Sequence, residues 1–81
     1  MMIPKIGQRV AVFEIVDTKY NIWYPVTVES YTIAGERGTE IVDSVTTDLA
    51  DFYENYVMFE DYQSLLLFLA EKFKAEDESP I

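Results

Sequence analysis

Residues 8–34 read QRVAVFEIVDTKYNIWYPVTVESYTIA, and this stretch decides the class of fold. β-Branched and aromatic residues, which favour extended backbone, dominate it. The pattern predicts two strands, Gln8–Val16 and Trp23–Ala34, separated by a polar turn at Asp17–Asn21. Pro25 falls near the start of the second strand, where its missing N–H matters least.

The sequence after Ala34 continues the sheet. Gly35 and Gly38 enclose a four-residue hairpin turn, and the segment Thr39–Thr46 is predicted as a third strand. Residues 48–59, DLADFYENYVMF, are ambiguous, because the acids have helical spacing while the later aromatic and apolar residues alternate as in a strand. We expect a turn or a short helix there, followed by a strand.

A helix is predicted from about Tyr62 to Ala75, with Asp61 as its N-cap. One stripe at about 100° per residue is assigned to the sheet-facing side, and it comprises Tyr62, Leu65, Leu66, Leu69 and Phe73. Leu67 and Phe68 lie off that stripe. They suggest a homodimer or partner contact, although a helix buried between the sheet and a long loop would explain them equally well.

These elements predict an α+β fold, with an antiparallel sheet of three to four strands and one C-terminal helix packed on it. The sheet is expected as a meander or a partly closed SH3-like barrel. The 81 residues suffice for one domain, expected over residues 1–75, with a flexible acidic tail over residues 76–81. Because no apolar run is long enough for a signal peptide or a bilayer span, a cytoplasmic protein is expected.

The charge is concentrated in the second half of the chain. Residues 1–37 hold four acids and four bases, whereas residues 38–81 hold eleven acids against Lys72 and Lys74 alone. The formal net charge of −9 therefore comes entirely from the second half. Such a protein should repel nucleic acid, whose binding requires a basic face, so no direct nucleic-acid partner is expected.

The residue types present argue against an enzyme. The chain has no His and no Cys, and its three glycines are too scattered for a phosphate-binding loop. Asp43 and Glu54 occupy the first and twelfth positions of an EF-hand-like spacing, but Val45 and Asp48 stand where that loop needs a carboxylate or amide and a glycine. We therefore predict a non-catalytic protein with no metal or cofactor.

The sharper hypothesis is an acidic face that binds a protein with a basic surface or groove. The residues assigned to this face are Glu40, Asp43, Asp48, Asp51, Tyr53, Glu54, Tyr56, Glu60 and Asp61. In composition the chain resembles the small acidic DNA-mimicking inhibitors that phages and mobile elements direct against nucleases. That resemblance implies an inhibitor of a nuclease or another nucleic-acid-binding protein. The competing explanation is that the charge only promotes solubility.

A second resemblance lies in the first half of the chain. The segment Trp23–Val28, WYPVTV, looks like the second strand of Tudor and other SH3-like small barrels, which bind peptides with basic or methylated side chains in an aromatic pocket. It implies that Trp23 and Tyr24 form a cation-binding cage, because aromatic faces attract cations. An aromatic pair that simply fills a β core is the alternative.

Overall fold

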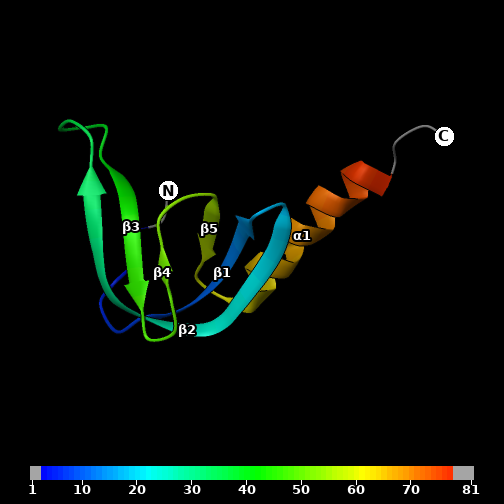
Figure 1. Cartoon of the computed structure of the whole chain (residues 1–81), viewed down its shortest axis with the longest axis horizontal. Helices are drawn as coiled ribbons and strands as arrows, with labels where there is room; N and C mark the ends of the chain where they lie inside the picture. The colour runs from blue at the N-terminus through cyan, green and yellow to red at the C-terminus, as the bar shows by residue number, and fades with distance from the viewer. Residues whose placement is uncertain (1–2, 78–81) are drawn as a thin grey trace.

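The protein is a five-stranded antiparallel sheet with one helix on one face, as Figure 1 shows for the computed structural model. The structure describes residues 3–77. The strands are β1 (Arg9–Val16), β2 (Lys19–Ala34), β3 (Ile41–Thr47), β4 (Asp51–Phe52) and β5 (Tyr56–Phe59), and the helix α1 spans Tyr62–Asp77. The α+β class is confirmed, but the expected count of three to four strands is wrong.

A tight turn at Asp17 and Thr18 makes β2 longer than predicted. Both residues have positive φ, 50° and 65°, which is the backbone of the two-residue turn that suits the twist of a hairpin. Val16 pairs directly with Lys19, so β2 begins at Lys19 and runs for 16 residues. Residues 19–21, which the sequence predicts as part of the turn, therefore belong to the strand.

The long strand β2 joins the two halves of the sheet. Residues 19–27 pair with β1, and residues 28–34 pair with β3, so the strand order is β4-β3-β2-β1-β5. The sheet bends along β2 and encloses the larger core cluster, which consists of Val10, Val12, Val26, Val28, Val45 and Phe52. Among the described residues no pairing joins β4 to β5, so the sheet is open.

Burial of Phe52 decides the ambiguous segment. Phe52 pairs with Val45 and is almost fully buried, which makes residues 51–52 a short strand rather than a helical turn. After a turn at residues 53–55, β5 pairs with β1 at the far edge of the sheet. The extra strand arises because Phe52 reaches the core only when its backbone is extended beside β3.

The helix packs on β1 and β5 through a second core cluster. Leu65 is fully buried against Ala11 and Phe13, and Phe68 packs on Phe13 and Phe59 with ring centroids 5.7 and 5.2 Å apart. The predicted stripe is therefore partly wrong, since Phe68 faces the sheet while Leu66 is 46% exposed. Tyr62, although 38% exposed, does contact the sheet, because its ring stacks on Tyr24 of β2. Residues 65–69 are all apolar, so their periodicity leaves the centre of the buried stripe undetermined.

The helix extends to Asp77, two residues past the predicted end, and residues 78–81 of the predicted tail lie outside the described part of the chain. None of the helices within the described residues is both long and apolar enough to cross a membrane.

Candidate functional site

The nine residues predicted to bind a partner do not form one face. Three of their carboxylates accept hydrogen bonds from backbone amides. Asp48 Oδ1 accepts a hydrogen bond from the Thr27 amide at 2.8 Å, and Glu40 Oε2 accepts one from the Gly38 amide at 2.8 Å. Asp61 caps α1, as predicted, because its Oδ1 accepts a hydrogen bond from the Ser64 amide at 2.7 Å.

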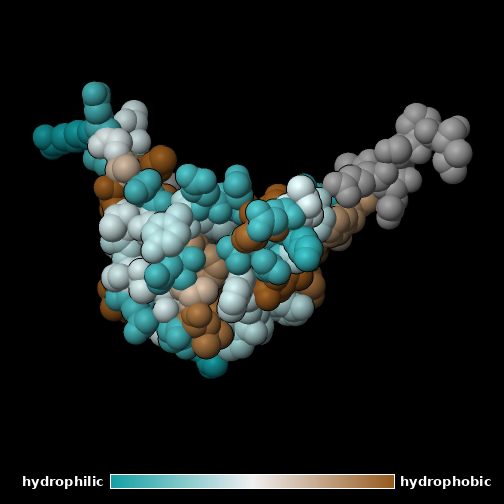
Figure 2. Space-filling view, in the orientation of Figure 1, coloured by the Kyte–Doolittle hydropathy of each residue, from teal (hydrophilic) through white to brown (hydrophobic). Residues whose placement is uncertain are grey.

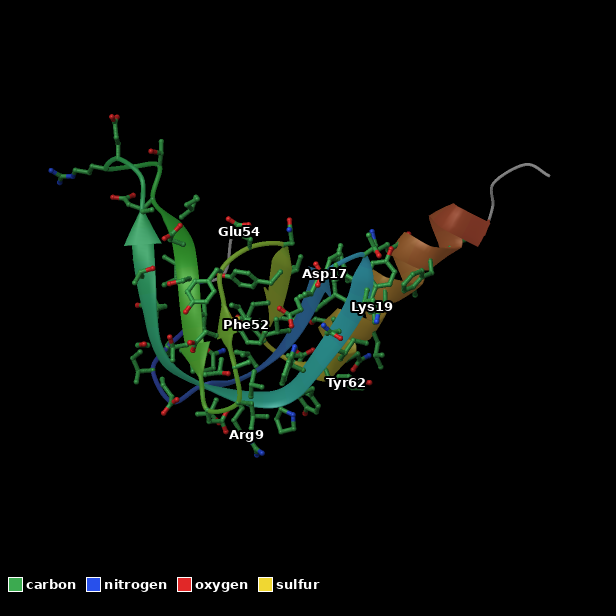
Figure 3. The ribbon with its side chains drawn as sticks, viewed as in Figure 1. Arg9, Asp17, Lys19, Phe52, Glu54 and Tyr62 are labelled. Atoms are coloured by element: carbon green, nitrogen blue, oxygen red, sulfur yellow. The ribbon has the colours of Figure 1, made fainter. Side chains whose placement is uncertain are left out.

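Most of the remaining members lie around β4 but on both of its faces, since Tyr53 hydrogen-bonds to Asp51 on the outer face while Tyr56 packs on Phe52 at the core face. We call the set Asp43, Asp51, Tyr53, Glu54 and Tyr56 the acidic strip. Asp51 pairs with Thr46 of β3, the strand that also carries Asp43. The Tyr53 hydroxyl donates to Asp51 Oδ2 at 3.3 Å. Figure 3 shows Glu54 just above Phe52 of β4, at the end of the molecule opposite to Arg9. Glu60 is exposed between β5 and α1, outside this strip.

The two tyrosines of the strip are protonated near neutral pH, as the ordinary tyrosine pKa of about 10 already ensures, and their surroundings raise the pKa of each further. The charge of Asp51, together with its hydrogen bond, raises the pKa of Tyr53 above 10.0. Burial, followed by the charge of Asp43, raises the pKa of Tyr56 in the same direction. Both phenols are therefore neutral hydrogen-bond donors near neutral pH, set among negative charges.

The charges of the strip are not neutralised within the protein. Among residues 3–74, whose side chains the structure describes, no carboxylate forms an ion pair with Lys or Arg. The local sequence explains this, because residues 38–71 contain no base. Asp43, Asp51 and Glu54 are all exposed, so their charges face solvent. In the same part of the chain no group of three acids lies close enough to hold a metal ion. The arrangement is suited to contact with a positively charged surface.

No protein family model, no curated protein and no solved structure matches this chain. The functional argument therefore rests on the residues themselves.

The two aromatic residues of the proposed cage lie on opposite faces of β2. Trp23 faces the larger core, where its ring meets Phe52 at 5.9 Å and its Nε1–H donates to Glu14 at 2.7 Å. Tyr24 points to the helix side and stacks on Tyr62 at 4.7 Å. Successive side chains of a strand alternate between its faces, so the strand assignment itself already separates this pair.

Sequence reasoning missed the partner of Trp23. Glu14 lies two positions after Val12 on β1, and Val12 is paired with Trp23, so Glu14 shares the face of the indole. The signal was present as an acid at an inward-facing position within the otherwise apolar run of residues 10–16. Because the half-buried indole N–H needs an acceptor, the carboxylate there satisfies it.

Proposed function

We propose that this chain is a small, acidic, non-catalytic domain that binds a basic site on another protein, in the manner of an inhibitor that imitates nucleic acid. The observation that supports the proposal is the acidic strip, whose three exposed carboxylates form no ion pair among residues 3–74 and lie near two tyrosines. A cytoplasmic partner, such as a nuclease encountered by a phage or a mobile element, is part of the same proposal.

Electrostatics supports a partner whose groove normally takes nucleic acid. Such a groove is lined by Lys and Arg that neutralise phosphates. The three carboxylates of the strip, Asp43, Asp51 and Glu54, correspond to roughly 5 Å of duplex DNA at one charge per roughly 1.7 Å, so the strip would occupy a small part of such a groove. Tyr53 is well exposed and adds an aromatic side chain of the kind that is frequent at the centre of protein interfaces.

The test compares two double charge reversals that raise the net charge by the same amount. Asp51→Lys with Glu54→Lys alters the strip, and Glu29→Lys with Glu36→Lys alters exposed acids on β2 and the β2–β3 hairpin. Each immobilised protein is exposed to lysate at low and high salt, and bound proteins are identified by mass spectrometry. Urea unfolding of each variant verifies its fold.

We expect to capture a basic protein that binds both the wild type and the Glu29→Lys, Glu36→Lys variant. The same protein should not bind the Asp51→Lys, Glu54→Lys variant, and high salt should release it. If every captured protein binds both double variants equally, the strip is not a binding surface, and the acidic residues serve solubility.

A second candidate is a peptide-binding module of SH3-like build. It draws on the bend of β2, which wraps the sheet around the larger core as a partly closed barrel would. It also draws on Trp23, whose half-buried indole lies beside the Glu14 carboxylate, since an aromatic face near a negative charge attracts cations.

This candidate is tested by titrating the single tryptophan's fluorescence with lysine-rich and methyl-lysine peptides. A saturable change that Asp51→Lys with Glu54→Lys leaves intact would favour the peptide reader over the acidic inhibitor. If the tryptophan fluorescence does not change at millimolar peptide concentrations, the peptide-binding function is excluded.

A further inference from the structure

The first half of β2 is an edge of the sheet. Residues 19–26 pair with β1 along one side, and β3 pairs only from Val28 onward. Beyond these ladders, no backbone hydrogen bond within the described chain reaches residues 19–26. An exposed strand edge of this kind offers unpaired N–H and C=O groups to another strand.

An apolar surface lies directly beside this edge. Tyr20, Ile22 and Tyr24 of β2 point to the helix side and remain 47%, 48% and 53% exposed. Tyr62 and Leu66 of α1 are also exposed. We call these five residues the β2–α1 surface, and Figure 2 shows apolar patches in the region where β2 runs beside α1.

Aromatic contacts fix the two ends of this surface. Tyr24 stacks on Tyr62 at one end, while at the other end the rings of Tyr20 and Phe73 meet at 5.7 Å. Between them, Ile22 and Leu66 have no such cover and remain about half exposed. Two rigid aromatic pairs therefore flank an open aliphatic centre.

The segments that form this surface lack acidic residues, which is unusual in so acidic a chain. Residues 18–28 and 62–70 contain no acid at all, and the fold brings these two stretches together. The Tyr20 end carries two bases, since Lys19 precedes Tyr20 and Lys72 Nζ lies 5.9 Å from its ring. The acids Asp17 and Glu71 flank these two bases in the sequence. The Tyr24 end is acidic, because Tyr62 follows Glu60 and Asp61. Lys19 and Tyr62 mark the two ends in Figure 3.

We propose that a second copy of this chain docks on the β2–α1 surface, with the two β2 edges pairing antiparallel about a two-fold axis at Ile22. In this register Tyr20 lies opposite Tyr24 of the second copy, and the basic end of each copy meets the acidic end of the other. Parallel pairing would instead join like charges. Pro25 has no N–H and closes the ladder opposite Lys19 of the second copy.

The dimensions of the surface suit such a dimer. Three strand spacings, roughly 14 Å, separate the two β1 strands across the axis, and α1 lies over β1 and β5, so two helices about 10–12 Å wide fit side by side without a clash. Both helices lie on the same face, and the exposed Leu66, Ile22 and Tyr24 line the space between them. Five half-exposed large side chains supply about 500 Å² per copy. The backbone of the β2 edge adds to this area. The total buried area then reaches the lower range of specific protein interfaces.

Sedimentation velocity over a concentration series tests the proposal. We expect a dimer with a dissociation constant of roughly 1–100 µM, as a small interface gives. Ile22→Lys should weaken it at least tenfold, because two lysines then face each other at the axis. Ile33→Lys is the matched control, since Ile33 lies on the same strand with the same exposure of 48%, beyond the proposed interface.

A charge-swap experiment separates this interface from a merely damaged fold. Ile22→Lys and Ile22→Glu should each be monomeric, and their equimolar mixture should form a heterodimer, which only an interface that places Ile22 against itself explains. Amide hydrogen exchange of residues 20–24 should slow as the concentration of the wild type rises.

The proposal is overturned if the wild type remains monomeric up to about 1 mM. It is also overturned if Ile33→Lys dissociates the dimer as strongly as Ile22→Lys, or if the mixture of the two charged variants stays monomeric. None of these outcomes bears on the acidic strip, whose test uses different residues.

Discussion

Replacing Leu65 by Ala should remove a large part of the stability of this domain. Leu65 is 0% exposed and links α1 to Ala11 and Phe13 of β1. The change deletes three buried carbons at about 0.8 kcal/mol each, and an unfilled cavity adds to that loss. We therefore expect a loss of about 3 kcal/mol, against a total of roughly 4–12 kcal/mol for a chain of 81 residues.

Urea unfolding followed by circular dichroism measures this loss. With an m-value of about 1 kcal/mol/M for a small domain, the midpoint should fall by roughly 2–3 M. Leu67→Ala is the matched control, because Leu67 lies on the same helix but is 62% exposed. Leu67→Ala should lower the free energy of unfolding by no more than about 0.5 kcal/mol.

The comparison of these two leucines tests the orientation of α1. If Leu67→Ala lowers the midpoint as much as Leu65→Ala does, the helix presents a different stripe to the sheet. A Leu65→Ala protein as stable as the wild type would likewise refute the packing of α1 on β1.

Three further changes probe single contacts. Asp61→Ala should lower the melting temperature at pH 7, and Asp61→Asn should lower it less, because a neutral amide oxygen still accepts from the Ser64 amide. The Ser64 amide lowers the pKa of Asp61 below its ordinary 3.8, so the advantage of the wild type over Asp61→Asn is present above pH 3.8 and is lost as the pH falls through the folded-state value, which melting curves of both proteins between pH 2 and 7 would check. Glu14→Ala should cost about 1–2 kcal/mol in urea unfolding, because it leaves the Trp23 indole N–H without its acceptor, and Glu14→Gln should cost less. Gly35→Ala should also lower the urea midpoint, because Gly35 has φ of 106° and an added Cβ would lie 2.8 Å from a backbone oxygen, whereas Gly38→Ala, with a positive φ but open space around it, should cost less.

The sequence predicted the elements that depend on local patterns. The strands around residues 9–16 and 41–47, the existence of the hairpin at Gly35 and Gly38, and the helix after Asp61 all follow from residue types within a few positions of each other. The predicted four-residue turn is wrong in length, because Ala34 pairs with Ile41 and the loop spans residues 35–40. The Asp61 cap was predicted because a carboxylate before an apolar helix has one favoured partner, the amide of the first turn.

The site was predicted less completely. The many acidic residues between positions 40 and 61 indicated a negative surface, but the sequence did not show which carboxylates accept hydrogen bonds from the backbone. Asp48, Glu40 and Asp61 bind backbone amides, and this use depends on where the chain turns. The pairing of Trp23 with Tyr24 was an error of a different kind, because residues adjacent in a strand cannot share one face.

The amino-acid sequence by itself determined the α+β class, the absence of His and Cys, and the concentration of negative charge in the second half, because these follow from composition and short-range pattern. Only the tertiary structure decided how β2 divides its pairing between β1 and β3, which stripe of α1 is buried, and that two acid-free stretches lie together. The contacts of α1 join residues tens of positions apart, and the division of β2 depends on two hairpins that share one strand. Local propensity cannot specify such contacts, since burial of the whole chain selects among many locally equivalent arrangements.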